Sequence, residues 1–475
     1  MNSILSYFRD VFQKIISGGK DVNTSMLDNL ISDKMAAHLM FAEHLYENNT
    51  EYIDWLRSGE VKSLRLASVV AREIATKVCL ETKITVSGQG ERAEYLNRQL
   101  ALFLRKLPIY VEQAVALGNL AFKPYVDGDN VYIKAAKLGS FIPVRYNSNG
   151  TYDACIFVSK LILNDTHYTK LEYHHIENGI YTVENTAYKA NNSFNYGLGQ
   201  KISLAEIPEW ADISPIVTLS GDIRPLYSVY SNPFANSIDT DSPLGASIFA
   251  DCIDLIREAD EMWERSDYEV RSGERRIYAP PQSFQNIGGN TYKVSRFYKT
   301  FNADDDNFFR EFSPVFRNEA IEAHLQTIFK RIEQNIGTSF GTISDPMSVE
   351  RTATEVKNSK ERLYNTVTAI QRTMKSCIEQ AVDAADRICD LYGIGGTKGD
   401  YQLVCSWDDS VIESKDEIAA RALSEYQNGL IDTVEYFMQT KGMNEEEATA
   451  YVQKIKQRSP ENVGADWFDD KGVGA

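Results

Sequence analysis

Residues 351–392 read RTATEVKNSKERLYNTVTAIQRTMKSCIEQAVDAADRICDLY. From Leu363 onward, apolar side chains recur every three or four residues, which is the spacing of one face of an α-helix. Thr352 and Glu355 have the spacing of a capping box at its start. The apolar positions are Val356, Leu363, Val367, Ile370, Met374, Cys377, Ala381, Ala385 and Ile388. We therefore expect one helix from Thr352 to about Tyr392, longer than a typical globular helix.

Two shorter helices precede this one and bracket an irregular segment. The first is predicted from Leu244 to about Val270, behind the helix-start pair Ser242-Pro243. Its apolar stripe comprises Ile248, Cys252, Leu255, Ala259 and Met262, and its charged stripe comprises Asp251, Asp254, Glu258, Glu261 and Arg265. The second is predicted from Asn318 to Ile336. Between them, residues 273 to about 315 hold Pro280-Pro281 and Gly288-Gly289 and favour a compact insertion of short strands and turns.

The flanking regions differ in their periodicity. Residues 1 to about 118 are mostly of helical period, with a strand expected at 83–86 and a break at Pro108. Residues 120 to about 230 alternate with period two, and Asp127-Gly128 and Asn178-Gly179 are hairpin turn signals, so an antiparallel β region is expected. After residue 400 we expect a strand at 402–405 and two or three helices between Glu413 and Gln457. The fold class is therefore α+β and mainly α-helical.

Composition and charge limit the function. The chain has 475 residues, a length that suggests roughly three domains, and its 43% hydrophobic content is that of a globular protein. Its net charge is -17. The acidic balance argues against a conventional tight DNA or RNA binder. Residues 243–272 contribute -5 and residues 408–475 contribute -8, so most of the negative charge lies in these two segments. No run of 18 apolar residues occurs, and no membrane span is expected.

Motifs for catalysis or metal binding are weak throughout. The six cysteines form no CxxC pair, and His174-His175 would point to opposite faces of a strand. There is no phosphate-binding GxxxxGK[ST] loop, and Asp304-Asp305-Asp306 lacks the rest of a calcium loop. We therefore expect no enzyme, no cofactor and no metal site. A hydrolase that uses acidic pairs such as Asp408-Asp409 stays open as an alternative.

Several short motifs occur in a characteristic order. They are SPLG at 242–245, FSPVFR at 312–317, Gly341-Thr342, RTATEV at 351–356, WDDS at 407–410 and NGLI at 428–431. In this order, from about Asn29 to about Gln457, the chain resembles the portal proteins of tailed bacteriophages, and it looks closest to those of phages of Gram-positive hosts. Another ring component of a virion or phage-like particle, such as a head–tail connector, is the nearest alternative.

The resemblance implies a division of the chain into named regions. These are a wing at 1–241 (with helices over 1–118 and the β region over 119–241), stem helix 1 at 242–272, a small α/β clip at 273–317, stem helix 2 at 318–336, a tunnel loop at 337–350, a long wing helix at 351–400, and a crown with an acidic tail at 401–475.

The resemblance also implies a function and its partners. Portals of this kind form a ring, with twelve subunits expected here, at one capsid vertex. Double-stranded DNA passes through the ring without sequence specificity when the terminase packages it and when it is ejected into the tail. The implied partners are the terminase large subunit, the major capsid and scaffolding proteins and a head–tail adaptor. The expected location is the virion, with assembly in the host cytoplasm.

Three groups of residues are candidates for these roles. The channel-lining candidates in the tunnel loop are Thr338, Ser339, Phe340, Thr342, Ser344, Asp345 and Met347. The acidic face of the stem is assigned to Asp251, Asp254, Glu258 and Glu261. Clip docking is assigned to Arg275, Arg276, Tyr278, Tyr292 and Lys293.

Overall fold

The structure is a computed structural model, which describes most of the chain. The described residues are 31–80, 82–147, 150–190, 198–221, 224–274, 276–279, 298–300, 310–346, 353–407 and 415–458. The chain divides into two compact units, Met1–Trp407 and Asp408–Ala475. Each unit is described by itself below.

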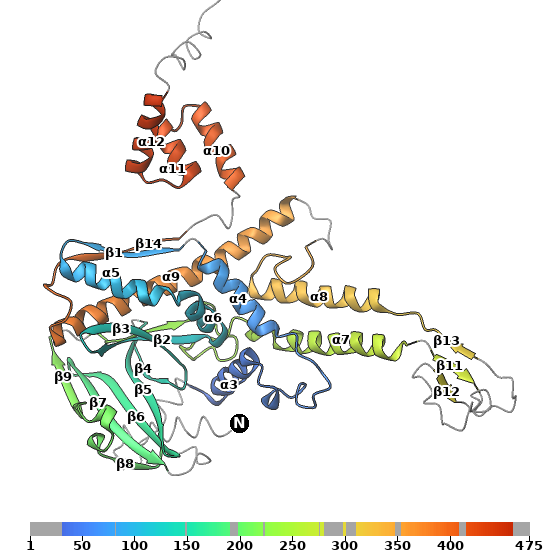
Figure 1. The fold of residues 1–475 in the computed structure, drawn as a ribbon, viewed down its shortest axis with the longest axis horizontal. Coiled ribbons are helices and arrows are strands. Elements are labelled where there is room, and N and C mark those ends of the chain that lie inside the picture. The colour runs from blue at the N-terminus through green and yellow to red at the C-terminus, as the bar shows by residue number, and fades with distance from the viewer. Residues whose placement is uncertain are drawn as a thin grey trace, which may run out of the picture. The chain divides into compact units, whose positions relative to one another are not determined.

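The predicted long helix is present as α9, Ala353–Tyr392. Its predicted apolar positions from Leu363 to Ile388 are all buried. They pack against strands and helices from the first half of the chain, including β2, β10, α4 and α5, which are defined below (Figure 1). The central place of α9 explains why so long a helix keeps one apolar face: it has protein beneath it over most of its length.

Four helices precede the sheets. They are α3 (Asp33–Glu47), α4 (Leu66–Val78), α5 (Glu91–Leu104) and α6 (Leu107–Leu117). The predicted break at Pro108 is confirmed, because α6 begins one residue before this proline. The helical period of this region does not give one continuous helix before α4. Asn48 ends α3 in the left-handed conformation with φ 57°, and the 3-10 turn Thr50–Tyr52 follows.

Antiparallel strands occupy the region 119–231, as predicted. A three-stranded sheet has the order β10-β2-β3, and a second sheet has the order β4-β5-β6-β7-β8, with β9 also paired to β7. The bounds are β2 Asn119–Asp127, β3 Asn130–Lys137, β4 Phe141–Tyr146, β5 Tyr152–Leu163, β6 Thr166–Glu177, β7 Ile180–Ala190, β8 Gln200–Ile202, β9 Ile216–Ser220 and β10 Ser228–Ser231. Asn178 and Gly179 both have positive φ, as a tight hairpin turn requires.

Two short 3-10 turns, Leu204–Glu206 and Pro208–Trp210, follow β8 and cover one end of the second sheet. A separate two-stranded ladder joins β1 (Lys83–Gly88) to β14 (Tyr401–Ser406). Both strands were predicted from the sequence. Their antiparallel pairing brings the segment after α9 back onto the N-terminal helices.

The two predicted helices before α9 are α7 (Ile253–Ser272) and α8 (Asn318–Ile336), which pack side by side (Figure 1). The predicted start of the first helix at Leu244 is wrong: a 3-10 turn, Ala250–Cys252, leads into α7. Asn119 and Asn232 explain the late start. Their side-chain amides donate to the carbonyls of Gly245 and Ala246 at 2.7 Å each, so these groups bond outside any helix.

The predicted apolar stripe of this helix also needs correction. The buried side chains of α7 are Ile256, Ala259 and the acid Asp260, whereas Leu255 and Met262 are only half-buried. Beyond α7 lies a three-stranded sheet with the order β12-β11-β13, formed by β11 (Arg276–Ala279), β12 (Tyr298–Thr300) and β13 (Arg310–Phe312).

The second unit contains α10 (Lys415–Gln427), α11 (Thr433–Lys441) and α12 (Glu445–Arg458), which agrees with the two or three helices predicted. A capping box of Asp432 and Glu435 starts α11. Across the described residues of both units, none of the helices has the length and apolar content that crossing a bilayer requires.

Candidate functional site around the α8–α9 connection

The connection between α8 and α9 begins with a helix stop. Gly337 adopts the left-handed conformation with φ 79°, and its backbone N–H donates to the carbonyl of Glu333. A Cβ at this position would lie 2.5 Å from Oγ1 of Thr366 in α9, so only glycine fits. The Thr366 hydroxyl donates to the carbonyl of Gly337 at 3.0 Å. The base of the connection is thus held between the two helices.

Glu333 is the centre of the next contacts. Its side chain is buried, with 1% of its surface exposed. The carboxylate accepts the backbone N–H of Ile343 at 2.7 Å, the backbone N–H of Ser344 at 2.9 Å and the Ser344 hydroxyl at 2.8 Å. Sequence reasoning missed this residue. Its one signal was an acid set between Ile332 and Ile336 in an otherwise apolar stripe.

Further contacts hold the connection along α8 and α9. The backbone N–H of Asp345 donates to Oε1 of Gln326 at 2.7 Å. The guanidinium of Arg362 lies 5.4 Å from the ring centre of Phe340. The partners on α8 therefore move back from residue 333 to residue 326 as the connection proceeds. Residues 337–345 run antiparallel along α8, and we call them the anchored segment.

Most predicted channel-lining residues lie in the anchored segment, and they differ in exposure. Thr338 and Ser344 are buried, with 4% and 3% of their surface exposed. Three further residues are half-buried, and Asp345 is exposed. The half-buried residues are Ser339, Phe340 and Thr342. Met347 lies outside the described residues. Of the described candidates, Asp345 is the one whose side chain is exposed.

The predicted acidic residues of the stem fall at the start and along the exposed side of α7. Asp251 precedes the helix and accepts the Ser237 hydroxyl at 2.7 Å. Asp254 is exposed, and Glu258 lies 3.2 Å from Nε2 of His324 in α8. Glu261 forms an ion pair with Arg257 one turn before it, at 2.8 Å. The four residues do not form an uninterrupted acidic surface, because basic side chains lie between them.

Asp260 is a fifth acid of α7 that the sequence did not single out. It is fully buried and accepts the indole N–H of Trp55 at 3.0 Å and the backbone N–H of Leu64 at 2.7 Å. Burial raises the pKa of its carboxyl, and these two donors partly oppose the effect. Asp260 therefore ties α7 to the segment before α4.

Only two of the predicted docking residues can be placed. Arg276 and Tyr278 lie two positions apart on β11, so they belong to the same face of the small sheet. Both are half-buried. Arg275, Tyr292 and Lys293 lie outside the described residues.

A cluster of ionisable groups lies inside the β region. Glu172 accepts from His174 at 2.8 Å and lies 3.3 Å from Lys170, and it pairs with Lys123. Nδ1 of His174 lies 2.7 Å from the Tyr181 hydroxyl, which accepts the backbone N–H of Leu226. Burial opposes ionisation, but Lys123 and His174 hold the pKa of Glu172 well below its usual range. This buried network links strands and gives both ring nitrogens of His174 a partner within the β region.

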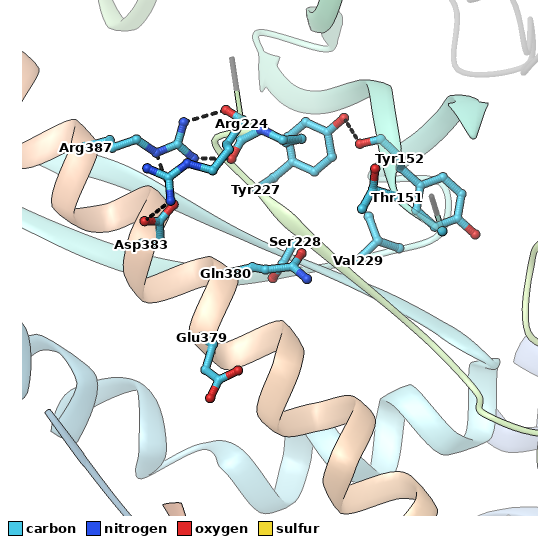
Figure 2. A pocket seen from close by; sticks show the side chains of 12 residues that line it. Thr151, Tyr152, Arg224, Tyr227, Ser228, Val229, Glu379, Gln380, Asp383 and Arg387 are labelled. Carbon is cyan, nitrogen blue, oxygen red and sulfur yellow. Dashed lines mark hydrogen bonds and ion pairs between the residues drawn. The ribbon is translucent and has the colours of Figure 1, made fainter. Parts of the chain in front are cut away.

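Figure 2 shows a pocket of about 400 Å³ between α9 and the segment 224–229. Arg224 donates to Asp383 at 2.7 Å, and Arg387 donates to the carbonyls of Arg224 and Pro225. The guanidinium groups of Arg224 and Arg387 are therefore bonded to neighbouring protein groups. Cysteine nucleophiles are not indicated either, since burial raises the pKa of Cys79, Cys252 and Cys377 to about 12. Among the described residues, no cluster of metal-ligating side chains occurs.

The sequence model of one family, described as "Phage portal protein, SPP1 Gp6-like", matches residues 73–462. The chain belongs to this family. It is a phage portal protein, as its ordered motifs predicted, and thus a structural component that forms the portal ring of a phage or phage-like particle. The resemblance to portals of Gram-positive hosts in particular stays a prediction. The α+β fold class is confirmed by the helices and antiparallel sheets described above.

Comparison with individual proteins finds less similarity than the family model does. No curated protein matches this portal protein. A solved structure that is similar to it is titled "Neck of native GTA particle computed with C12 symmetry". The two are 10% identical, the match covers 82% of this chain and 92% of that chain, and the TM-score is 0.36.

Proposed function

We propose that this portal protein assembles into a ring of twelve copies at one vertex of the capsid, and that double-stranded DNA passes through the ring during packaging and ejection. The family match over residues 73–462 carries the proposal. It spans α7, α8, the anchored segment and α9, which are the elements that a channel would need. The proposed division into wing, stem, clip, tunnel loop and crown keeps the boundaries given above.

The chemistry of the surface supports passage instead of binding. A protein that neutralised many DNA phosphates with Lys and Arg would hold the duplex tightly. Instead, α7 carries the exposed acids Asp254 and Glu258 and the half-buried Glu261. We place these acids beside the duplex, and we place Asp345 of the anchored segment as the nearest described residue of the tunnel loop. DNA would then pass without sequence readout, because no base-reading groups are assigned to this surface.

Partners follow from the same proposal. The small sheet β12-β11-β13 would form the clip, where Arg276 and Tyr278 would meet the terminase large subunit during packaging and a head–tail adaptor afterwards. The β region of the wing would face the major capsid and scaffolding proteins. Assembly would take place in the host cytoplasm, and the finished ring would remain in the virion. No enzymatic step is assigned to the portal itself.

The mass and the shape of the purified protein test the ring. Twelve copies of a 53.7 kDa chain give about 640 kDa. We expect light scattering after size exclusion to report a particle near this mass, and negative-stain images to show a ring with a central hole. Recombinant rings with a different subunit number would still support the proposal. A stable monomer at micromolar concentration would contradict it.

A further inference from the structure

We propose that Glu333 is the positioning residue of the tunnel loop. It fixes the anchored segment on α8. This stretch of the loop therefore moves together with α8, and not independently of it, when DNA passes. The statement about DNA rests on the proposed function. The statement about Glu333 and the loop rests on the contacts of the described residues alone.

The first observation is the kind of contact that the carboxylate makes. Glu333 is 1% exposed, and no ion pair to it occurs among the described residues. Its negative charge is met by three donors, and all three belong to Ile343 and Ser344. Hydrogen bonds to an ionised acceptor are stronger than neutral ones. A buried carboxylate without them would be unfavourable, so the loop cannot leave α8 unless Glu333 is exposed or left unpaired.

The second observation concerns the backbone of the same residue. The Glu333 carbonyl accepts from the backbone N–H groups of Gly337 at 3.1 Å and Thr338 at 2.9 Å, and from the Thr338 hydroxyl at 3.3 Å. One residue thereby binds both the start and the end of the anchored segment. The Ser344 hydroxyl also accepts the backbone N–H of Gly341 at 3.1 Å, which closes the turn between these two ends.

The third observation is the sequence environment of Glu333. It lies between Ile332 and Ile336, which are both buried, on the face of α8 where leucine or isoleucine would pack without cost. An acid at such a position is explained by the donors that it holds. The segment's other contacts are with Gln326, Thr366 and Arg362. None of them reaches the Glu333 carboxylate, so they do not replace its three donors.

Hydrogen exchange of the assembled full-length ring tests the positioning role. In E333Q the new amide offers one acceptor oxygen and turns its NH₂ group toward a donor. We expect the peptide covering residues 338–346 to exchange about tenfold faster or more. The matched control is E319Q, an exposed acid in the first turn of α8 for which the structure shows no such donors among the described residues. Exchange of this peptide should be unchanged in E319Q. Unchanged exchange in E333Q would overturn the proposal.

Two further measurements keep the test decisive. Should E333Q fail to assemble, S344A removes the hydroxyl donor to Glu333 together with the acceptor of the Gly341 N–H, and keeps the two backbone donors to the carboxylate. A smaller acceleration confined to the same peptide is then expected. An unchanged rate in S344A would then count against the proposal. Packaged DNA per particle should fall in E333Q rings that look normal by negative stain. Faster exchange with normal packaging would overturn the role toward DNA, whereas a wild-type chain that forms no ring would instead remove the proposed function.

Discussion

His38 is a buried base whose titration should contribute to the acid sensitivity of the fold. It lies in α3 with 7% of its surface exposed, and its Nε2 accepts the backbone N–H of Ser247 at 3.2 Å. Burial lowers its pKa from 6.5 to about 4, with a small opposing effect of Asp251. The unfolded chain therefore binds a proton between pH 6.5 and 4 that the folded chain does not. Stability is lost as the pH falls through this range.

We expect this residue to contribute about 2 kcal/mol of the loss in unfolding free energy between pH 7 and pH 5. H38Q keeps an acceptor for Ser247 and removes the titration, so its stability should fall less on acidification. Denaturant unfolding at a fixed protein concentration measures the difference. H167Q, which changes a half-exposed histidine of β6, should keep the wild-type dependence. An identical pH dependence in H38Q and wild type would refute the assignment.

Asp260 gives a second prediction at this scale. Its two carboxylate oxygens each accept one donor, from Trp55 and from Leu64. D260N retains one acceptor and sets an NH₂ group against the other donor, so we expect a loss of about 2 kcal/mol in unfolding free energy. D254N, an exposed acid of the same helix, should change it by less than about 0.5 kcal/mol. Equal unfolding free energies of the two variants would show that the Asp260 contacts do not stabilise the fold.

The acids that sequence reasoning missed have hydrogen-bond donors that are far away in the sequence or lie in a loop. Trp55 lies 205 positions from Asp260. An acid on a helix looks like a solvent-exposed charge until its distant donors are known. Glu333 was overlooked for a related reason, since its donors lie in a loop that has no periodicity. The exposed acids Asp254 and Glu258 were predictable because their neighbours are on the same helix or on α8 beside it.

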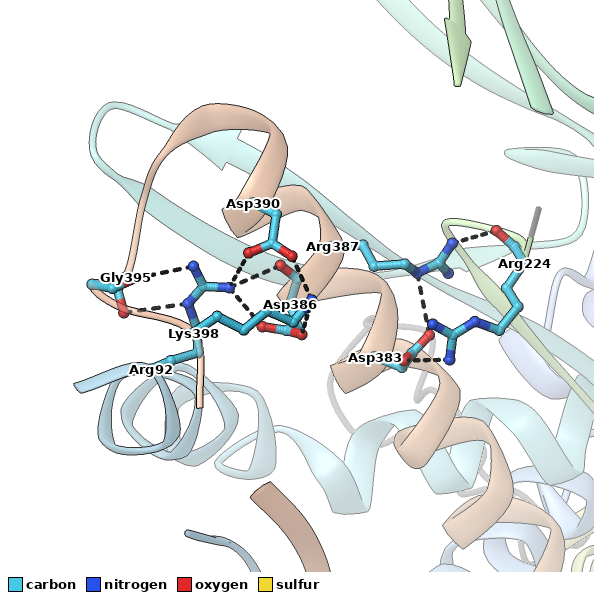
Figure 3. Close-up of polar contacts among 9 residues, drawn as sticks. Arg92, Arg224, Asp383, Asp386, Arg387, Asp390, Gly395 and Lys398 are labelled. Carbon is cyan, nitrogen blue, oxygen red and sulfur yellow. Dashed lines mark hydrogen bonds and ion pairs between the residues drawn. The ribbon is translucent and has the colours of Figure 1, made fainter. Parts of the chain in front are cut away.

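Among elements, α9 depends on how its C-terminal end is fixed to α5. Figure 3 shows the Arg92 guanidinium between carboxylates of α9 and carbonyls of the following loop. It donates to Asp386 at 2.6 Å, to Asp390 at 2.8 Å and to the carbonyls of Gly395 and Gly396. Arg92 and Asp386 are both buried. This cluster joins α5, α9 and the segment that leads to β14.

We expect R92M to lower the unfolding free energy by about 3 kcal/mol, because Asp386 stays buried and keeps only Lys398 as a cationic partner among the described residues. Thermal or denaturant unfolding of the full chain measures this. R105M removes an exposed arginine at the end of the same helix and should be close to neutral. A neutral R92M would mean that the cluster is dispensable for holding α5 on α9.

Elements with local signals were predicted well, and elements set by distant partners were not. The period of α9 and the Asn178-Gly179 turn need only neighbouring residues. The start of α7 depends on Asn119 and Asn232, which capture backbone groups more than ten residues away in sequence. The pairing of β1 with β14 joins Lys83 to Ser406. The periodicity of either strand alone does not predict which strand it pairs with.

At the scale of the whole molecule, the net charge of -17 by itself argues against nucleic acid. The proposed function changes the meaning of this charge, because a duplex that moves through the ring would need a surface that does not hold it. The structure refines the picture further. Of the eight acids in residues 243–272, Asp260 is buried and Glu269 is paired with Arg317 at 2.7 Å. Under the proposed function, the acids of α7 that would face DNA are a smaller set, namely Asp254, Glu258 and Glu261.

Reversing those charges should convert a passage surface into a binding surface. We expect wild-type rings to leave a short duplex unretarded in a gel at about 150 mM salt, and rings of the variant D254K/E258K/E261K to retard it. Retardation should weaken steeply as salt rises, because binding to phosphates releases counterions. A variant with the same net charge but altered elsewhere, E51K/E94K/E209K, provides the matched control, since these acids are exposed and lie outside α7. Equal retardation by both variants would mean that total charge, and not its placement on α7, governs contact with DNA.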